Sequence, residues 1–235
     1  MTSTAKVFLI PVPIDEDAID TLPPATLHVL YQIQHFIAER SKTARHYLKL
    51  LGHPKPQSEI NILEIPKHGT LEYQEIKQWL DNGHPIGILS ESGCPGIADP
   101  GAEVVSWAHK NGYMVEPLVG PSSILLGLMA SGFSGQSFVF HGYLPNKKDD
   151  LVKKLKTLEA NATRFNQSQI FIETPYRNGK FFEILIQTLH NTTKLSIQSG
   201  LTGKHAYSKT LTIRQWHEAK DIGLSNNIPA VFIIG

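Results

Sequence analysis

The chain has little of what several specialised protein classes need. Its 235 residues include one cysteine, Cys94, which excludes an internal disulfide framework and fits a reducing compartment. One thiol cannot build a zinc site without several histidine or carboxylate partners, and we expect no metal. No apolar run approaches the roughly 18 residues that suggest a membrane span, and residues 1–6 lack the apolar core of a signal peptide. We therefore expect a cytoplasmic protein.

An excess of one charge and two common nucleotide-binding motifs are also missing. The 22 basic and 21 acidic residues leave a net charge of +1, so no overall positive field marks a nucleic-acid-binding protein, although local basic patches fit this balance. The absence of Gly-x-Gly-x-x-Gly and of Gly-x-x-x-x-Gly-Lys-(Ser/Thr) counts against dinucleotide enzymes and P-loop nucleotide hydrolases. With 41% hydrophobic residues, the chain can still bury a substantial core.

Short apolar runs alternate with helical patterns along the whole chain. We expect strands at 6–12, 37–39, 61–65, 86–89, 114–118, 138–141, 170–173, 195–199, 211–213 and 230–234. We expect helices at 24–36, 41–51, 71–80, 101–111, 122–131, 149–161, 180–189 and 213–220. This alternation predicts an α/β protein with a mostly parallel sheet. The best domain boundary follows Leu118, which gives domains of residues 1–118 and 119–235 without a flexible linker.

The most informative stretch follows the strand expected at 86–89. Residues 90–101, Ser-Glu-Ser-Gly-Cys-Pro-Gly-Ile-Ala-Asp-Pro-Gly, are rich in small and turn-forming residues. Ligands of open α/β sheets bind at such strand ends. Gly93 and Gly96 have no Cβ atom, so a ligand can approach the backbone closely. By itself the stretch predicts a ligand-binding loop.

Six residues of this loop resemble the S-D-A-G-T-P-x-x-x-D-P-G signature of the tetrapyrrole methylase-like superfamily, whose members use S-adenosylmethionine: Ser90, Gly93, Pro95, Asp99, Pro100 and Gly101. Residues 140–147, Phe-His-Gly-Tyr-Leu-Pro-Asn-Lys, resemble F-x-G-F-L-P-x-K of its ribosomal RNA 2′-O-ribose branch. Residues 170–177, Ile-Phe-Ile-Glu-Thr-Pro-Tyr-Arg, resemble F-Y-E-S-P-H-R of the same branch. The resemblance implies a two-domain α/β fold. Its N-terminal sheet would be mostly parallel with flanking helices, its C-terminal sheet mixed with helices, and the cofactor cleft would lie between the domains.

The resemblance also implies a set of cofactor-binding residues. Further similar segments are 11–14 after the first strand, 119–123, and 229–231 at the start of the last strand. The implied residues are Pro13, Ser90, Ser92, Gly93, Cys94, Ile97, Gly120, Ser122, Ser123, Glu173, Gly200, Pro229 and Ala230. For Cys94 we favour a packing role, since methyl transfer needs no protein nucleophile.

The reaction that the resemblance implies limits the catalytic candidates. Methyl transfer from a sulfonium is an in-line displacement, in which the protein positions both reactants and a base removes a proton from a weak nucleophile such as a ribose hydroxyl. The candidate bases are Glu39, Glu91 and Glu173, with His141 as a further one. Basic residues in the segments that the family places around its substrate opening are expected to contact phosphate: Arg40, Lys42, Arg45, Lys147 and Arg177.

Departures from the family pattern leave more than one function open. Asp15, Glu16 and Asp17 stand where the family has Gly-Asn, Glu91 replaces an aspartate, and Arg40 replaces the aspartate of A-E-D-T-R. The leading expectation is an S-adenosylmethionine-dependent 2′-O-methyltransferase of ribosomal RNA that acts as a homodimer on ribosomal RNA or the small ribosomal subunit. The alternatives are a methylase of a tetrapyrrole-like small molecule and a cofactor-binding paralogue with lost or altered activity.

Overall fold

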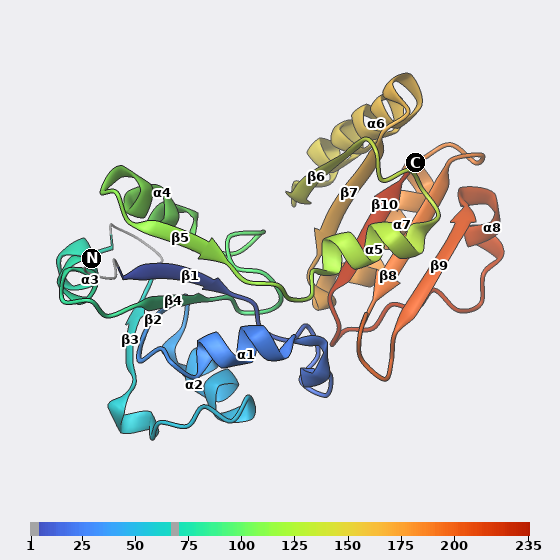
Figure 1. Ribbon diagram of the computed structural model, residues 1–235. Coiled ribbons are helices and arrows are strands. Elements are labelled where there is room, and N and C mark those ends of the chain that lie inside the picture. The colour runs from blue at the N-terminus through green and yellow to red at the C-terminus, as the bar shows by residue number, and fades with distance from the viewer. Residues whose placement is uncertain (1–4, 67–70) are drawn as a thin grey trace. The chain divides into compact units, whose positions relative to one another are not determined.

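The computed structural model describes residues 5–66 and 71–235. It divides the chain into two compact units, Met1–Ser122 and Ser123–Gly235. The division follows Ser122, four residues after the boundary at Leu118 that the sequence suggests. In Figure 1 the N-terminal unit runs from blue to green and the C-terminal unit from green to red.

The N-terminal unit is built on a parallel five-stranded sheet in the order β3-β2-β4-β1-β5. Its strands are β1 (Lys6–Ile10), β2 (His35–Ala38), β3 (Asn61–Glu64), β4 (Ile86–Leu89) and β5 (Met114–Pro117). A Cβ atom at Gly87 in β4 would lie 2.7 Å from Cδ1 of Ile10 and 2.9 Å from Cδ1 of Phe36. Glycine at this central position therefore makes room for two core side chains.

Helices cover both faces of this sheet. α1 (Pro24–Leu30) and α2 (Ser41–Leu50) pack in one hydrophobic cluster with Ile10 and Phe36. α3 (Tyr73–Asp81) and α4 (Ala102–Lys110) pack in another with Ile37 and Ile88. Because neighbouring side chains on a strand point to opposite faces, Phe36 and Ile37 place these two clusters on opposite sides of the sheet. Two short 3₁₀ helices, η1 (Ile19–Thr21) and η2 (Gln57–Glu59), lie in the connections.

At the carboxyl end of β4, the connections from neighbouring strands diverge toward opposite faces of the sheet. The connections after β1 and β2 lead to α1 and α2 on one face, whereas the connection after β4 leads to α4 on the other face. β4 lies between β1 and β2, so the loops after these neighbours separate in opposite directions. Open α/β sheets bind ligands in the crevice at such a point.

The C-terminal unit has a mixed sheet in the order β6-β7-β10-β8-β9. β6 (Phe138–Tyr143) and β7 (Ser168–Glu173) are parallel, whereas β10 (Ala230–Ile234) runs antiparallel to both β7 and β8 (Lys194–Ser199). β9 (Tyr207–Thr212) pairs antiparallel with β8 at the sheet edge.

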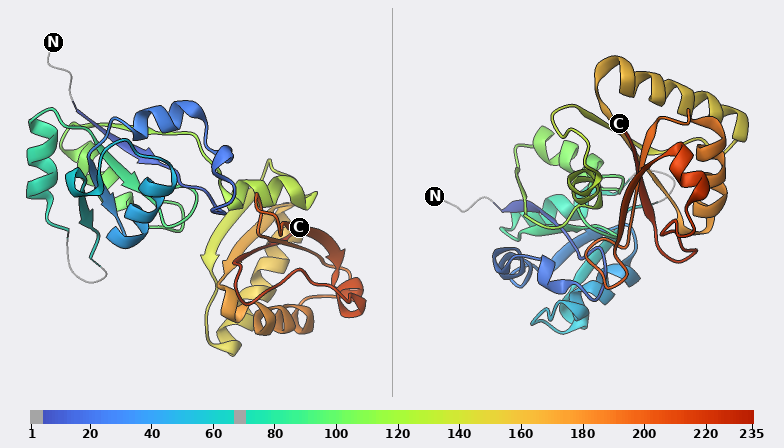
Figure 2. Two further views of the ribbon diagram at one scale, coloured as in Figure 1. Left: turned by 90° about the horizontal axis from the view of Figure 1, so that it is seen from below. Right: turned by 90° about the vertical axis from the view of Figure 1, so that its right-hand side faces the viewer.

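One helix covers one face of the mixed sheet and three cover the other. α5 (Ser123–Ser131) packs on Ile170 and Val231. α6 (Lys148–Phe165), α7 (Asn178–Thr188) and α8 (Ile213–Glu218) pack on Phe171 and Phe232. Figures 1 and 2 show α5 on one side of this sheet and the long helix α6 on the other. The short 3₁₀ helix η3 (Pro175–Arg177) links β7 to α7.

The fold class expected from the sequence is confirmed, and two elements differ from their expected bounds in an instructive way. The helix expected at 24–36 ends at Leu30, and Phe36 belongs to β2. Leu30, Ile33 and Ile37 continue a helical spacing into the strand, so periodicity alone could not end the helix. The strand expected at 211–213 is the longer β9. Its Ser, Lys and Thr residues suit an edge strand but give no run of apolar residues by which a sequence would reveal it.

Candidate functional site

The loop after β4 is folded back and tied to the segment after β1. Ser90 Oγ donates a hydrogen bond to the carbonyl oxygen of Gly93 at 2.6 Å, and the backbone N–H of Val12 donates to the same oxygen at 3.0 Å. The amide of Glu91 donates to Oδ2 of Asp99 at 3.0 Å, which closes the loop across its base. These bonds hold the predicted residues Ser90 and Gly93 at the divergence of the sheet, beside the turn that contains Pro13.

The glycines of this region serve different purposes. Gly93 has φ of +69°, and a Cβ atom there would lie 3.1 Å from the carbonyl oxygen of Pro121. A Cβ atom at Gly120 would lie 2.3 Å from Cβ of Pro11. Both glycines are therefore required by contacts within the protein. Gly96, with φ of +76°, has no atom within 4 Å of its Cβ position, so it is the glycine that faces open space.

Three further predicted residues of the loop differ in exposure. Ser92 and Ile97 are exposed, and Ile97 N donates to the carbonyl oxygen of Cys94 at 3.4 Å. Cys94 Sγ donates to the carbonyl oxygen of Pro121 at 3.4 Å, and burial raises the pKa of its thiol. A thiol that stays protonated is a poor nucleophile, which agrees with a packing role for Cys94.

Carboxylates gather at the carboxyl end of β2 and β4. Burial raises the pKa of Asp99 to about 6, and the nearby Glu39 and Glu91 carboxylates act in the same direction against the hydrogen bond from the Glu91 amide. Thr43 Oγ1 on α2 donates to Oε2 of Glu91 at 3.0 Å. Burial, with Glu16 and Glu91 adding to it, also raises the pKa of Tyr47. A cation bound at this edge would relieve the repulsion among these groups.

The basic residues predicted in the N-terminal unit have different surroundings. Arg40 and Lys42 are exposed at the start of α2. Arg45 instead donates from Nη1 to the carbonyl oxygen of Gln57 at 2.7 Å and from Nη2 to that of Ile60 at 3.3 Å. These bonds hold the connection between α2 and β3, so the Arg45 guanidinium is engaged within the protein.

Glu173 ends β7 with a completely buried side chain. Its Oε1 accepts hydrogen bonds from Thr174 N at 2.7 Å and Thr174 Oγ1 at 3.1 Å, and its Oε2 lies 3.2 Å from Nη2 of Arg177. Arg177 Nη1 also donates to Oδ1 of Asn146. A carboxylate engaged in this way shapes the loop, and its geometry gives no support to Glu173 as the base.

Three predicted residues of the C-terminal unit lie at the same end of its sheet: Gly200, Pro229 and Ala230. Ala230 in β10 lies opposite Glu173 on one side and Ser199 on the other, so Gly200 and Pro229 lie at the same edge. Ser199 Oγ donates to the carbonyl oxygen of Gly223 at 2.6 Å. The sequence therefore selects residues that the fold brings together within this unit.

His141 is placed by its hydrogen bond to a core side chain. Its Nε2 lies 2.8 Å from Oε1 of the buried Gln169 on the neighbouring strand. Burial lowers the pKa of His141. These features fit a packing role on β6.

Comparison with known proteins was made on sequence and on structure, and no family model matches the chain. Two curated relatives are both named ribosomal RNA small subunit methyltransferase I. The protein from Bacillus subtilis is 33% identical over 131 residues, which cover 56% of this chain and 43% of the relative. The protein from Vibrio cholerae is 29% identical over 199 residues, which cover 83% of this chain and 65% of the relative. The matches thus span between about two fifths and two thirds of the relatives' lengths.

Solved structures give the fold independently. The methyltransferase CobJ matches with a TM-score of 0.62 and 16% identity over 98% of this chain and 94% of its own. Cobalt precorrin-4 methyltransferase CbiF matches with a TM-score of 0.59 and 14% identity over 100% of this chain and 96% of its own. The chain shares the fold of these two methyltransferases. At these identities the structural likeness establishes the fold alone.

One departure from the superfamily pattern has a clear local structure. The acidic segment after β1 forms a turn in which Asp17 N donates to Oδ1 of Asp15 at 3.0 Å, and Ala18 N donates to the carbonyl oxygen of Asp15 at 3.0 Å. Glu16 Oε1 lies 3.1 Å from Nε2 of His46 on α2. The replacement of Gly-Asn therefore adds negative charge beside α2 and keeps a compact turn.

The sequence does not single out two residues that the structure places next to the predicted ones, Asp99 and Asn178. Asp99 was recognised only as part of the signature, because a sequence gives no sign of the burial that raises its pKa. Asn178 is completely buried at the start of α7, and its Nδ2 donates to the carbonyl oxygens of Ile228 at 2.9 Å and Ser225 at 3.3 Å. It fixes the segment before Pro229, and its position directly after the 170–177 motif was the available signal.

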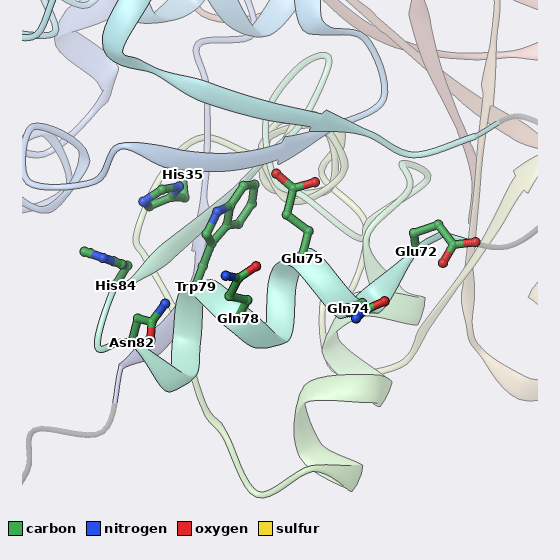
Figure 3. Close-up of a pocket in the computed structure, with 8 residues that line it drawn as sticks. All are labelled: His35, Glu72, Gln74, Glu75, Gln78, Trp79, Asn82 and His84. Carbon is green, nitrogen blue, oxygen red and sulfur yellow. The ribbon is translucent and has the colours of Figure 1, made fainter.

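A hollow of about 620 Å³ lies elsewhere on the N-terminal unit (Figure 3). Its lining includes His35, Trp79 and His84, with the His35 ring centroid 4.5 Å from that of Trp79 and 5.2 Å from that of His84. His35 begins β2 and His84 precedes β4, so the hollow lies at the opposite edge of the sheet from the signature loop. None of the predicted site residues lines it.

Within residues 5–66 and 71–235, no group of three or more His, Cys, Asp or Glu side chains is arranged to hold a metal ion. No helix in this part of the chain has the length and apolar character to cross a membrane.

Proposed function

We propose that this chain is an S-adenosylmethionine-dependent methyltransferase that modifies a ribose 2′-hydroxyl in small-subunit ribosomal RNA. The observation that carries the proposal is the signature loop at the divergence after β4, fixed by the bonds from Ser90 and Val12 to the Gly93 carbonyl. The names of the sequence relatives support the choice of RNA.

The residues present fit S-adenosylmethionine, which carries a sulfonium and an ammonium group against one carboxylate. Glu39, Glu91 and Asp99 provide negative charge for a cation, and the open backbone at Gly96 allows close approach. We propose that Ser92 and Cys94 contribute backbone contacts in the N-terminal unit. Further contacts in the proposed set come from Ser122, Ser123, Gly200, Pro229 and Ala230.

When bound, this cofactor supplies the methyl group as an activated sulfonium. The protein has to orient the ribose hydroxyl and accept its proton. Glu91 suits the second role because Thr43 orients its carboxylate without neutralising it, and Glu39 is the other candidate. The geometry favours both over Glu173, whose carboxylate is buried and paired with Arg177.

The first test is calorimetry with S-adenosylmethionine on the wild type and Glu91→Gln. Glutamine keeps an oxygen for Thr43 but removes the charge, so we expect about tenfold weaker binding, equivalent to about 1.4 kcal/mol. Glu75→Gln in α3 is the matched control for a lost carboxylate in the same unit and should bind as the wild type. Undetectable binding by the wild-type protein would refute the proposed function.

The second test measures the reaction itself. Small-subunit ribosomal RNA from a strain that lacks this gene is incubated with methyl-labelled cofactor and then treated with alkali. Cleavage of RNA by alkali needs a free 2′-hydroxyl, so 2′-O-methylation leaves a labelled, uncut linkage. Transfer of label to a tetrapyrrole instead of RNA would support the small-molecule alternative, and cofactor binding without any transfer would support the inactive paralogue.

We also propose a cytoplasmic homodimer, as expected for an enzyme of this superfamily that acts on ribosomal RNA. The exposed Met129 side chain on α5 supports a further apolar contact. Sedimentation should give twice the chain mass of 26.1 kDa. A single species at the chain mass at micromolar concentration would contradict the dimer.

A further inference from the structure

Two loops of the C-terminal unit follow neighbouring strands at the same end of its sheet. β6 and β7 are parallel neighbours, with Tyr143 opposite Ile172, so residues 144–147 and 174–177 follow the same end of the sheet. The hydrogen bond from Arg177 to Oδ1 of Asn146 joins these loops. The start of α6 therefore lies beside η3.

Tyr176 lies in the middle of η3 and is 76% exposed. The turn that carries it is fixed on both sides. On its N-terminal side, Thr174 is bonded to the buried Glu173, and the carbonyl oxygen of Thr174 accepts a hydrogen bond from Arg177 N at 3.1 Å. After it, Asn178 is bonded to the carbonyl oxygen of Ile228. A ring on a fixed turn loses little conformational entropy when a ligand stacks on it.

Exposed lysines lie on the two helices next to the turn that carries Tyr176. Lys147 and Lys148 are exposed at the start of α6, and Lys180 is exposed in α7, four residues after Tyr176. Asp149 and Asp150 also lie in the first turn of α6. They precede Lys153 and Lys154 by four residues, the spacing at which opposite charges pair along a helix. The Arg177 charge is engaged by Glu173, so Lys147, Lys148 and Lys180 carry the positive charge beside the ring.

We propose that the surface made of Lys147, Lys148, Tyr176 and Lys180 binds an unpaired segment of RNA. The proposal rests on the proposed function for the kind of nucleic acid and adds how that RNA is held. One base stacks on Tyr176, and the neighbouring phosphates contact the lysines. Stacking on a side chain requires a base that has left its own helix, whereas a duplex offers such a surface only its backbone. Tyr176 thus selects single-stranded RNA.

The test is fluorescence anisotropy with a short labelled RNA, measured as a single strand and after annealing to its complement. We expect Tyr176→Ala to weaken binding of the single strand by about tenfold and to leave duplex binding unchanged. Tyr176→Phe, which keeps the ring, should bind as the wild type. The double variant Lys147→Ala/Lys180→Ala should reduce the salt slope for the single strand by about 1.4. Lys49→Ala/Lys110→Ala, two exposed lysines of the N-terminal unit, is the matched control.

Equal affinity of Tyr176→Ala and the wild type for the single strand would overturn the inference, and so would tighter binding of an acidic peptide than of RNA at this surface. Cofactor calorimetry on the same proteins separates this result from the proposed function. If the wild type binds no cofactor but its RNA affinity depends on Tyr176, the methyltransferase proposal fails and this inference stands. If the cofactor binds and Tyr176→Ala leaves the RNA affinity unchanged, this inference fails and the methyltransferase proposal stands.

Discussion

The two units present opposite charges at the sheet ends where their candidate functional residues gather. The N-terminal unit places Glu39, Glu91 and Asp99 at the carboxyl end of its parallel sheet, and Glu16 lies near them beside α2. The C-terminal unit places lysines and one exposed tyrosine at the end of β6 and β7. The net charge of +1 hides this contrast. An acidic edge suits a cationic cofactor, and a basic, aromatic edge suits a polyanion.

The largest expected effect concerns the buried ion pair of the C-terminal unit. Arg177→Ala leaves the buried Glu173 carboxylate without its cation, which should lower the free energy of unfolding by about 3 kcal/mol. Urea denaturation measures this loss. Adding Glu173→Gln to the variant should restore part of the stability, because the uncompensated charge is then removed. A single variant as stable as the wild type would show that the pair does not organise this edge.

A smaller effect is expected in the N-terminal sheet. Gly87→Ala brings a Cβ atom against Ile10 and Phe36, and overpacking of this kind should cost about 2 kcal/mol of stability. The matched control is Gly179→Ala in α7, where a Cβ atom meets nothing within 4 Å. Alanine favours a helix over glycine, so this control should gain about 0.5–1 kcal/mol. Changes of opposite sign in the free energy of unfolding, measured by chemical denaturation, would confirm that the two glycines have different roles. Changes of the same sign would contradict it.

The smallest effect is a pH dependence that belongs to the acidic edge. The pKa of Asp99 is raised to about 6 from its ordinary value of 3.8, so the folded state holds this proton more tightly than the unfolded chain. Its contribution to stability is complete below about pH 4 and is lost as the pH rises through about 6. Asp99→Asn keeps an acceptor for the Glu91 amide. The difference in unfolding free energy between variant and wild type should therefore change between pH 4 and 6 and stay constant above pH 7.

Much of the fold could be predicted from the sequence because its signals are local. The strand at 86–89 and the helix at 41–51 have clear apolar patterns and end at turn residues. The strand appears in the structure with the same bounds, and the helix ends one residue earlier, at Leu50. The end of α1 and the polar edge strand β9 could not be predicted in this way. The end of α1 and the pairing of β9 depend on contacts between distant parts of the chain, and the spacing of apolar residues in the sequence does not report these contacts.

The candidate site could be predicted as a set of motifs but not as a set of roles. The signature loop pointed to Ser90 and Gly93, yet the contact of Gly93 with the Pro121 carbonyl depends on how the loop folds. Arg45 has the right charge for phosphate and is bonded instead to two backbone carbonyls. Tyr176 is part of the 170–177 motif, yet its exposure on a fixed turn is visible only once the turn is built.

The most direct test of the central claim is the affinity for S-adenosylmethionine as a function of pH, measured by calorimetry on the wild type and Asp99→Asn. If the acidic edge of the N-terminal unit holds the cationic cofactor, binding favours the ionised form of Asp99. The affinity of the wild type should then rise between pH 5 and pH 7 and level off, whereas Asp99→Asn should bind more weakly at pH 7 and show a flatter profile. A wild-type affinity that is constant over this range, or a variant with the same profile, would contradict the account.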